Sequence, residues 1–195
     1  AWDYNLKNGT YAEYNSPTYT VEAITDLSRI YAEIKDEKVH AMAGDLLDLA
    51  WKTVAEHFHA PTGQWTGPHA RSYTWLTAPN TLSFLRYALD NGEKLISDAD
   101  YQYSLQFPYV RIECPEKYRA AFDTIVPHDV NLGFTTGMSL KEPRNTIAVA
   151  HLTQAYTLSS WEIMSTWNQR RNLLGYWGGE QPRFINATIL HNLYD

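Results

Sequence analysis

With 195 residues, the chain can bury one sizeable core, or one core and part of a second. Charged residues make up 19% of it, and its formal net charge is −6. This acidic balance and the scattered Lys and Arg residues argue against a nucleic-acid partner, because phosphate binding needs concentrated positive charge. An acidic polymer could bind only through a local cluster of cations. No apolar run approaches the roughly 20 residues that cross a bilayer, so no membrane partner is expected.

Aromatic residues are abundant: seven Trp, 14 Tyr and six Phe make up 14% of the chain. Most such rings fill protein cores, but sugar faces also stack on Trp and Tyr, so the excess favours a glycan partner. Cys114 is the single cysteine, which excludes an intramolecular disulfide and a cysteine zinc site. We expect no metal and no cofactor.

The first 20 residues show no regular period. Apolar residues at three- and four-residue spacing then predict a helix from Val21 to Ile34 and another from Val39 to Phe58. The charged corner at 35–38 is short, so these helices are expected to form an antiparallel hairpin. Pro and Gly residues interrupt the pattern at 60–79. Two shorter helices are expected further on, at Asn80–Asp90 and Pro115–Phe122.

Strand-like patterns begin near residue 132. Alternation predicts a strand at Asn145–Leu152, and Thr153–Leu158 either continues this strand or runs back along it. Two more strands are predicted at Arg170–Trp177 and Arg183–Leu190, with a Gly178-Gly179 turn between them. Helices followed by strands predict an α+β fold. We divide it into a helical region, 1–131, and an antiparallel β region, 132–195. The last strand ends close to Asp195, which indicates that further chain or a partner strand completes the sheet.

Three short segments are rich in polar and aromatic groups. In the first, at 13–19, Ser16 or Thr18 suits helix entry, while Glu13 and Asn15 could hold substrate hydroxyl or carboxyl groups. In the second, at 64–73, His69, Arg71 and Tyr73 alternate and would share one side of an extended loop. They would supply a base, a fixed cation and a proton donor. The alternative is a structural loop bonded to backbone carbonyls.

The third segment spans 166–177. Here Asn168, Arg170 and Asn172 would share one face of a strand and Arg171 the other, and Arg170 would bind a carboxylate or form a structural salt bridge. His57 and His59 diverge on a helix, which makes them a poor metal pair. Four carboxylates could serve hydrolysis, although no spacing pairs any two: Glu13, Glu56, Asp129 and Glu162.

Three stretches, EYNSPTY at 13–19, TGQWTGPHARSY at 62–73 and TWNQRRNLLGYW at 166–177 running on to Gln181-Pro182-Arg183, resemble heparinase-like polysaccharide lyases and the lyases that release rhamnose from glucuronic acid. The resemblance implies an (α/α) toroid joined to a β-sheet region, and β-elimination at a uronic acid. It implies that Asn15 and Arg71 neutralise the C6 carboxylate, His69 removes the C5 proton and Tyr73 protonates the leaving oxygen. Binding of the sugar would fall to Glu13, Tyr19, Trp65, Asn168 and Arg170.

A complete toroid needs about a dozen helices, so the resemblance also implies that this chain is part of a longer one. The expected partner is a polysaccharide or oligosaccharide substrate, and the expected location is secreted or periplasmic. Two other functions remain open. One is a glycoside hydrolase, which needs two facing carboxylates. The other is a non-catalytic glycan-binding or structural module that uses Trp and Tyr as platforms.

Overall fold

The computed structural model describes residues 1–90, 92–136, 144–162, 168–179 and 181–187. Residues 166 and 167 of the third segment, and 188–190 of the last expected strand, lie outside the described residues. The elements in chain order are α1 (Trp2–Asn8), α2 (Pro17–Glu33), α3 (Glu37–His57), β1 (Phe58–His59), η1 (Ala60–Thr62), β2 (Gln64–Trp65), α4 (Pro79–Leu89), η2 (Gly92–Leu95), α5 (Gln106–Tyr109), α6 (Glu116–Arg119), η3 (Ala120–Phe122), β3 (His128–Thr136), β4 (Arg144–Leu152), β5 (Tyr156–Glu162), β6 (Leu173–Trp177) and β7 (Arg183–Ala187).

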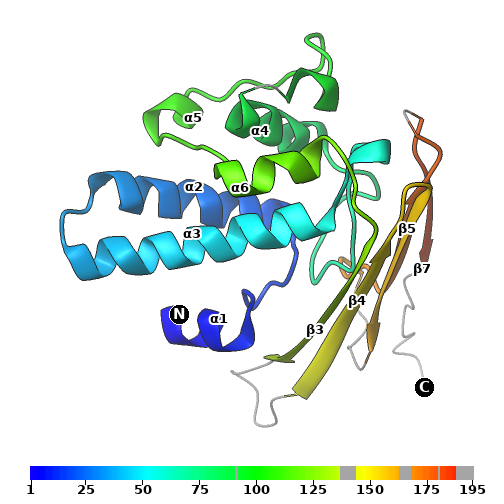
Figure 1. Ribbon diagram of the computed structural model, residues 1–195, viewed down its shortest axis with the longest axis horizontal. Coiled ribbons are helices and arrows are strands. Elements are labelled where there is room, and N and C mark those ends of the chain that lie inside the picture. The colour runs from blue at the N-terminus through cyan, green and yellow to red at the C-terminus, as the bar shows by residue number, and fades with distance from the viewer. Residues whose placement is uncertain (91, 137–143, 163–167, 180, 188–195) are drawn as a thin grey trace.

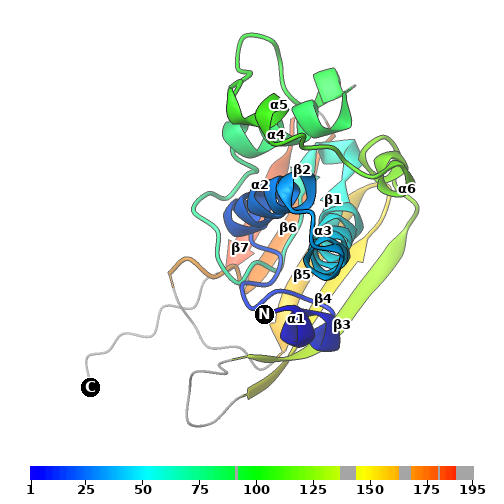
Figure 2. The same ribbon diagram turned by 90° about the vertical axis from the view of Figure 1, so that its left-hand side faces the viewer.

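The predicted helical hairpin is confirmed. Ser16 caps α2 by accepting a hydrogen bond from the Tyr19 N–H at 3.4 Å, and Asp36 caps α3 in the same way through the Val39 N–H at 3.0 Å. The two helices run side by side in opposite directions, with α4 and α6 above them (Figure 1). Figure 2 looks along α2 and α3 and shows the strands as a separate layer beside the helices.

The main core lies among the helices. Ile24 of α2, Trp51 of α3 and Phe84 of α4 are at most 1% exposed, and the Trp51 and Phe84 rings stack with centroids 6.0 Å apart. Burial of rings of this size is a main source of helix stability here, because most of the stability of a helix in a protein comes from packing of its apolar face. Many of the aromatic residues therefore have a structural role.

Five antiparallel strands form one sheet in the order β3-β4-β5-β6-β7, so the predicted α+β fold with an antiparallel sheet is confirmed. Residues 153–155 make a turn, and β5 returns along β4. The strands differ from expectation in three places. β3 was not expected as a strand, and it begins at His128, inside the expected helical region, where His128 pairs with Leu152. β4 begins at Arg144 instead of Asn145, and β6 begins at Leu173 instead of Arg170.

Two features join the helices to the sheet, and sequence patterning predicted neither. The short helix α1 lies along the outer strand β3, where the Tyr4 hydroxyl donates to the Thr135 carbonyl at 2.6 Å and Asn8 Oδ1 accepts from the Thr135 N–H at 3.2 Å. The loop after α3 contacts β5, through a 2.6 Å bond between the Thr66 and Thr157 hydroxyls. This loop contains the second polar segment, so the fold sets it between the two layers.

Candidate functional site

The structure brings the three polar segments together, and Asn15 is the residue that joins the first two. Its side-chain N–H groups donate to the carbonyls of Thr66 and Pro68 at 2.9 and 3.2 Å, and its Oδ1 accepts from the Trp65 indole N–H at 2.6 Å. The backbone of Asn15 has a φ of 48°, in the left-handed region that Asn tolerates better than most residues. This side chain is 1% exposed and uses both its donors and its acceptor within the protein.

The second and third segments pair with each other as a short antiparallel bridge between His69 and Arg171. The Arg171 N–H donates to the His69 carbonyl at 3.0 Å, and the Ser72 N–H donates to the Gln169 carbonyl at 2.7 Å. The Arg171 guanidinium, on a residue only 4% exposed, donates to the Ser72 carbonyl at 2.8 Å and lies 3.9 Å from the centroid of the Trp75 ring. The guanidinium thus fixes the loop from the inside.

On the outer side of these segments lies what we call the arginine–tyrosine surface, made of Glu13, Tyr19, Arg71, Tyr73 and Arg170. Arg71 holds two of its members: one terminal nitrogen is 3.2 Å from Glu13 Oε1 and the other donates to the Tyr19 hydroxyl at 3.0 Å. The hydroxyls of Tyr19 and Tyr73 are 3.1 Å apart, and these side chains come from residues 37% and 52% exposed. Two phenols and a guanidinium therefore share one hydrogen-bonded group at the surface.

The pKa values of the two phenols are shifted in opposite directions. The hydrogen bond from Tyr73, followed by that from Arg71, lowers the pKa of Tyr19, while the same Tyr19–Tyr73 bond raises the pKa of Tyr73. Burial lowers the pKa of Arg170. The negative charge of Glu13 raises this pKa and the positive charge of Arg71 lowers it further. The lowered pKa favours the ionised form of Tyr19 and the raised pKa favours the protonated form of Tyr73, and these are the forms that a base and an acid need.

The comparisons with known proteins reach only part of the chain. Residues 2–88 match a family described as "Domain of unknown function (DUF8769)". That match covers less than half of the chain. It contains the first two segments and ends before the third. No curated protein and no solved structure matches this chain.

The expectation that His69, Arg71 and Tyr73 share one side is wrong. The bridge to Arg171 directs His69 inward, where it is 2% exposed, while Arg71 and Tyr73 face outward. Its Nδ1 donates to the Asn15 carbonyl at 2.6 Å, since a carbonyl can only accept. Burial lowers the pKa of His69 to about 3. The imidazole is therefore neutral and holds the first segment against the second.

Three other expected roles also change. Asn15 is fully engaged inside the protein, which does not fit a role in neutralising a carboxylate. Trp65 is 0% exposed, so it cannot be a platform for a sugar. Residues 168–172 precede β6, so Asn168 and Arg170 do not share a strand face, although Arg170 does reach the arginine–tyrosine surface. Asn168 is exposed, and its carbonyl accepts from Arg171 at 3.0 Å.

Sequence reasoning missed the contact between Tyr19 and Tyr73, and it gave Tyr19 a binding role only. The two residues are 54 positions apart, and no local pattern signals the contact. It also missed the structural role of Arg171. The expected alternation of Arg170 and Arg171 was the available signal, because it placed the two guanidinium groups on opposite sides.

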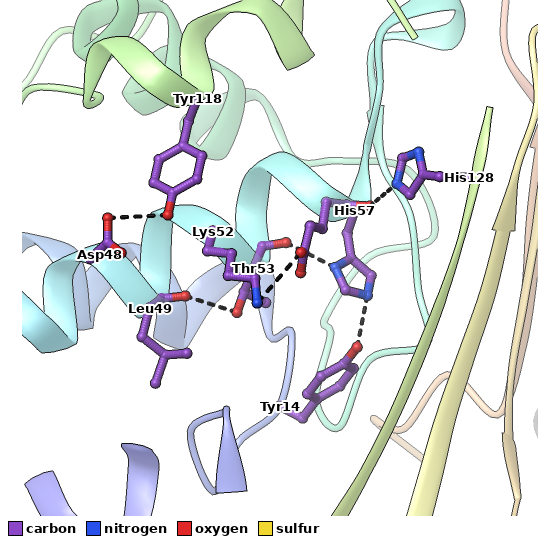
Figure 3. A network of polar contacts seen from close by, with 9 residues as sticks. Tyr14, Asp48, Leu49, Lys52, Thr53, His57, Tyr118 and His128 are labelled. Carbon is purple, nitrogen blue, oxygen red and sulfur yellow. Dashed lines mark hydrogen bonds and ion pairs between the residues drawn. The ribbon is translucent and has the colours of Figure 1, made fainter. Parts of the chain in front are cut away.

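His57 belongs to a second group of polar contacts, which Figure 3 shows between α3 and β3. Its Nδ1 donates to the Thr53 carbonyl at 2.8 Å, so its Nε2 is the acceptor for the Tyr14 hydroxyl, also at 2.8 Å. Burial lowers the pKa of His57 to about 4 and raises that of Tyr14 above its usual range. His59 bonds instead to Thr62 and to the Thr153 carbonyl.

Within the described residues, no group of three or more His, Cys, Asp or Glu side chains is arranged to hold a metal ion. None of the helices in this part of the chain has the length and apolar character needed to cross a membrane.

Proposed function

We propose that the protein is a polysaccharide lyase that acts by β-elimination on a glycan containing uronic acid. The observation that carries the proposal is the pair of phenols, whose hydroxyls are 3.1 Å apart beside Arg71. A lyase of this kind needs a base and an acid next to a group that binds a carboxylate. The arginine–tyrosine surface offers all three, from residues that the resemblance to lyases also includes.

In the proposed reaction Tyr19, as phenolate, removes the C5 proton, since its pKa is the lowered one of the pair. The electrons of the C5–H bond form the C4–C5 double bond, and the bond from C4 to the glycosidic oxygen breaks. Tyr73, which its raised pKa keeps protonated, gives its proton to that oxygen. Hydroxyls so close together suit removal and donation of a proton on the same side of the sugar ring.

The substrate proposed is acidic because the surface has more cations than anions. Among the described residues of this surface, Arg71 and Arg170 face one carboxylate, that of Glu13, which leaves one net positive charge while both tyrosines are protonated, on a chain whose net charge is −6. Arginine suits this task because its planar fork binds a carboxylate through two hydrogen bonds. Neutralising the C6 carboxylate in this way acidifies the C5 proton. His69, Asn15 and Arg171 are positioning residues in this scheme.

The experiment that tests the proposal is incubation with polysaccharides that contain glucuronate, galacturonate, mannuronate or guluronate, followed by product analysis. β-Elimination gives an unsaturated sugar that absorbs in the ultraviolet and carries no oxygen from solvent water. A saturated reducing sugar labelled from ¹⁸O-water would overturn the lyase proposal in favour of hydrolysis. Tight binding without turnover of any of these polymers would instead support a non-catalytic glycan-binding module. The secreted or periplasmic location remains part of the proposal.

A glycoside hydrolase is the second candidate, and one observation favours it. Glu56 of α3 and Asp129 of β3 line the same hollow of about 230 Å³, beside the polar contacts of Figure 3. Two carboxylates across a pocket are the usual requirement for glycoside hydrolysis. The hollow is small for an oligosaccharide, since ligand pockets usually measure roughly 300–1,000 Å³, and we therefore rank this candidate second.

A further inference from the structure

A separate hollow of about 580 Å³ lies in the helical layer, away from the arginine–tyrosine surface. The guanidinium-bearing residues Arg86, Arg111 and Arg119 line it, together with Tyr87 and Tyr101. Its size falls within the usual range of small-molecule sites, roughly 300–1,000 Å³. Three arginines around one concave site favour an oxyanion ligand, because each offers several donors in a fixed geometry.

Two of these arginines are held in place by backbone carbonyls. Arg86 donates to the Ile96 carbonyl at 3.1 Å, and Arg119 donates to those of Cys114 and Leu89 at 3.1 and 2.9 Å. Their side chains are 15% and 24% exposed.

Within the described part of the chain, the hollow is also lined by two carboxylate residues, Asp90 and Glu113, so three arginines face two carboxylates there. The carboxylates paired with Arg86 and Arg119 are, in contrast to these arginines, highly exposed. Side-chain exposure is 90% for Asp98, which pairs with Arg86, and 77% and 93% for Glu113 and Glu116, which pair with Arg119. Exposed ion pairs contribute little, so an incoming oxyanion can replace such partners at small cost. Both arginines are preorganised for a ligand.

Arg111 differs from the other two. Its φ is 53°, a left-handed conformation that disfavours a long side chain and that glycine would adopt without penalty. Among the described residues, no hydrogen bond or ion pair of its guanidinium compensates for this conformation. Residues with strained backbone conformations concentrate at functional sites. Arg111 lines the hollow and supplies a third cation there.

We propose that this hollow binds a monosaccharide that carries a single oxyanion, either a carboxylate or a phosphate. The arginines would bind the oxyanion. The Tyr87 and Tyr101 side chains supply a ring surface and two hydroxyls for the sugar, with the Arg86 guanidinium 4.5 Å from the Tyr101 centroid. Burial raises the pKa of both phenols, which therefore remain hydrogen-bond donors near neutral pH. This site is independent of the proposed lyase chemistry.

The test is calorimetric titration of the whole chain with glucuronate and glucose 6-phosphate, which separate the two oxyanions, and with glucose and inorganic phosphate. We expect saturable binding of at least one acidic sugar, and weaker binding of glucose and of inorganic phosphate. Arg111→Met and Arg111→Gly should each weaken the binding at least about tenfold, the usual effect of losing a charged hydrogen-bond partner. Arg29→Met, which removes an exposed arginine of α2 that does not line the hollow, is the matched control.

Folding and the first surface are controlled separately. Arg111→Gly should unfold at the same temperature as the wild type or higher, because glycine relieves the left-handed conformation. Arg71→Met, at the arginine–tyrosine surface, should retain the binding. The proposal is overturned if neither acidic sugar binds, if both Arg111 variants bind like the wild type, or if inorganic phosphate binds as tightly as glucose 6-phosphate. None of these outcomes depends on lyase activity.

Discussion

Replacement of Asn15 distinguishes a structural role from a substrate-binding one. Asn15→Ala removes two hydrogen bonds to carbonyls and one from the Trp65 indole, all in the interior. Buried groups left without partners cost about 1–3 kcal/mol each, but water and relaxation recover part of this, so we expect a total loss of about 3–5 kcal/mol. Such a loss is a large fraction of the stability of an ordinary domain.

Asn15→Gly is the matched variant. It loses the same side-chain bonds but adopts the left-handed backbone freely, so it should be roughly 1 kcal/mol more stable than Asn15→Ala. The assay is urea denaturation followed by tryptophan fluorescence and circular dichroism, with the two midpoints compared at a common slope. A loss below about 1 kcal/mol for Asn15→Ala, together with abolished glycan turnover, would refute the structural role and restore the neutralising one.

Three further perturbations follow from the geometry. Folding keeps His57 and His69 neutral, with pKa values of about 4 and 3 against 6.5 for the free side chain. Between pH 6.5 and 4 the unfolded chain therefore binds more protons than the folded one, and the stability falls as the pH falls. Urea denaturation midpoints at pH 7 and pH 5 check this, and equal midpoints would contradict it. Gly175→Ala should destabilise the fold by about 1–3 kcal/mol, because the new methyl group would lie 2.8 Å from the Thr157 carbonyl oxygen. Gly133→Ala, whose methyl group would lie 4.0 Å from its nearest neighbour, should cost less when both variants are compared by thermal unfolding. Arg171→Met should lower the thermal midpoint far more than Arg183→Met, since only Arg171 is buried and bonded to two carbonyls; similar midpoints would show that the bridge does not need it.

The parts of the fold that could be predicted depend on short-range signals. Ser16 and Asp36 mark helix starts, and the apolar periods that follow them belong to α2 and α3. The Gly178-Gly179 turn between β6 and β7 is equally local, since both glycines have positive φ values. By contrast, α1 has no side-chain cap and depends on its contact with β3. That contact joins residues more than 120 positions apart.

The candidate site was predictable only as a grouping of segments. Their density of polar and aromatic groups pointed to 13–19, 64–73 and the third segment, and these do meet. The orientation of each side chain was not predictable, because the bridge between His69 and Arg171 joins positions about 100 residues apart and decides which residues face inward. Alternation along an isolated loop gives no information about such a bridge. For this reason His69 lies inside and Tyr73 lies outside.

The most direct test of the central claim is the rate of unsaturated product formation by Tyr19→Phe, compared with that of the wild type. The control is Tyr109→Phe, which alters an exposed tyrosine of α5 that is not part of the arginine–tyrosine surface. If Tyr19 is the base, the rate should fall by about 10²–10⁴, the usual contribution of a general base, with thermal unfolding unchanged. Tyr109→Phe should retain the wild-type rate. Loss of a base predicts at least about a hundredfold fall in the rate. The account would be contradicted by a Tyr19→Phe variant that keeps more than about half of the wild-type rate.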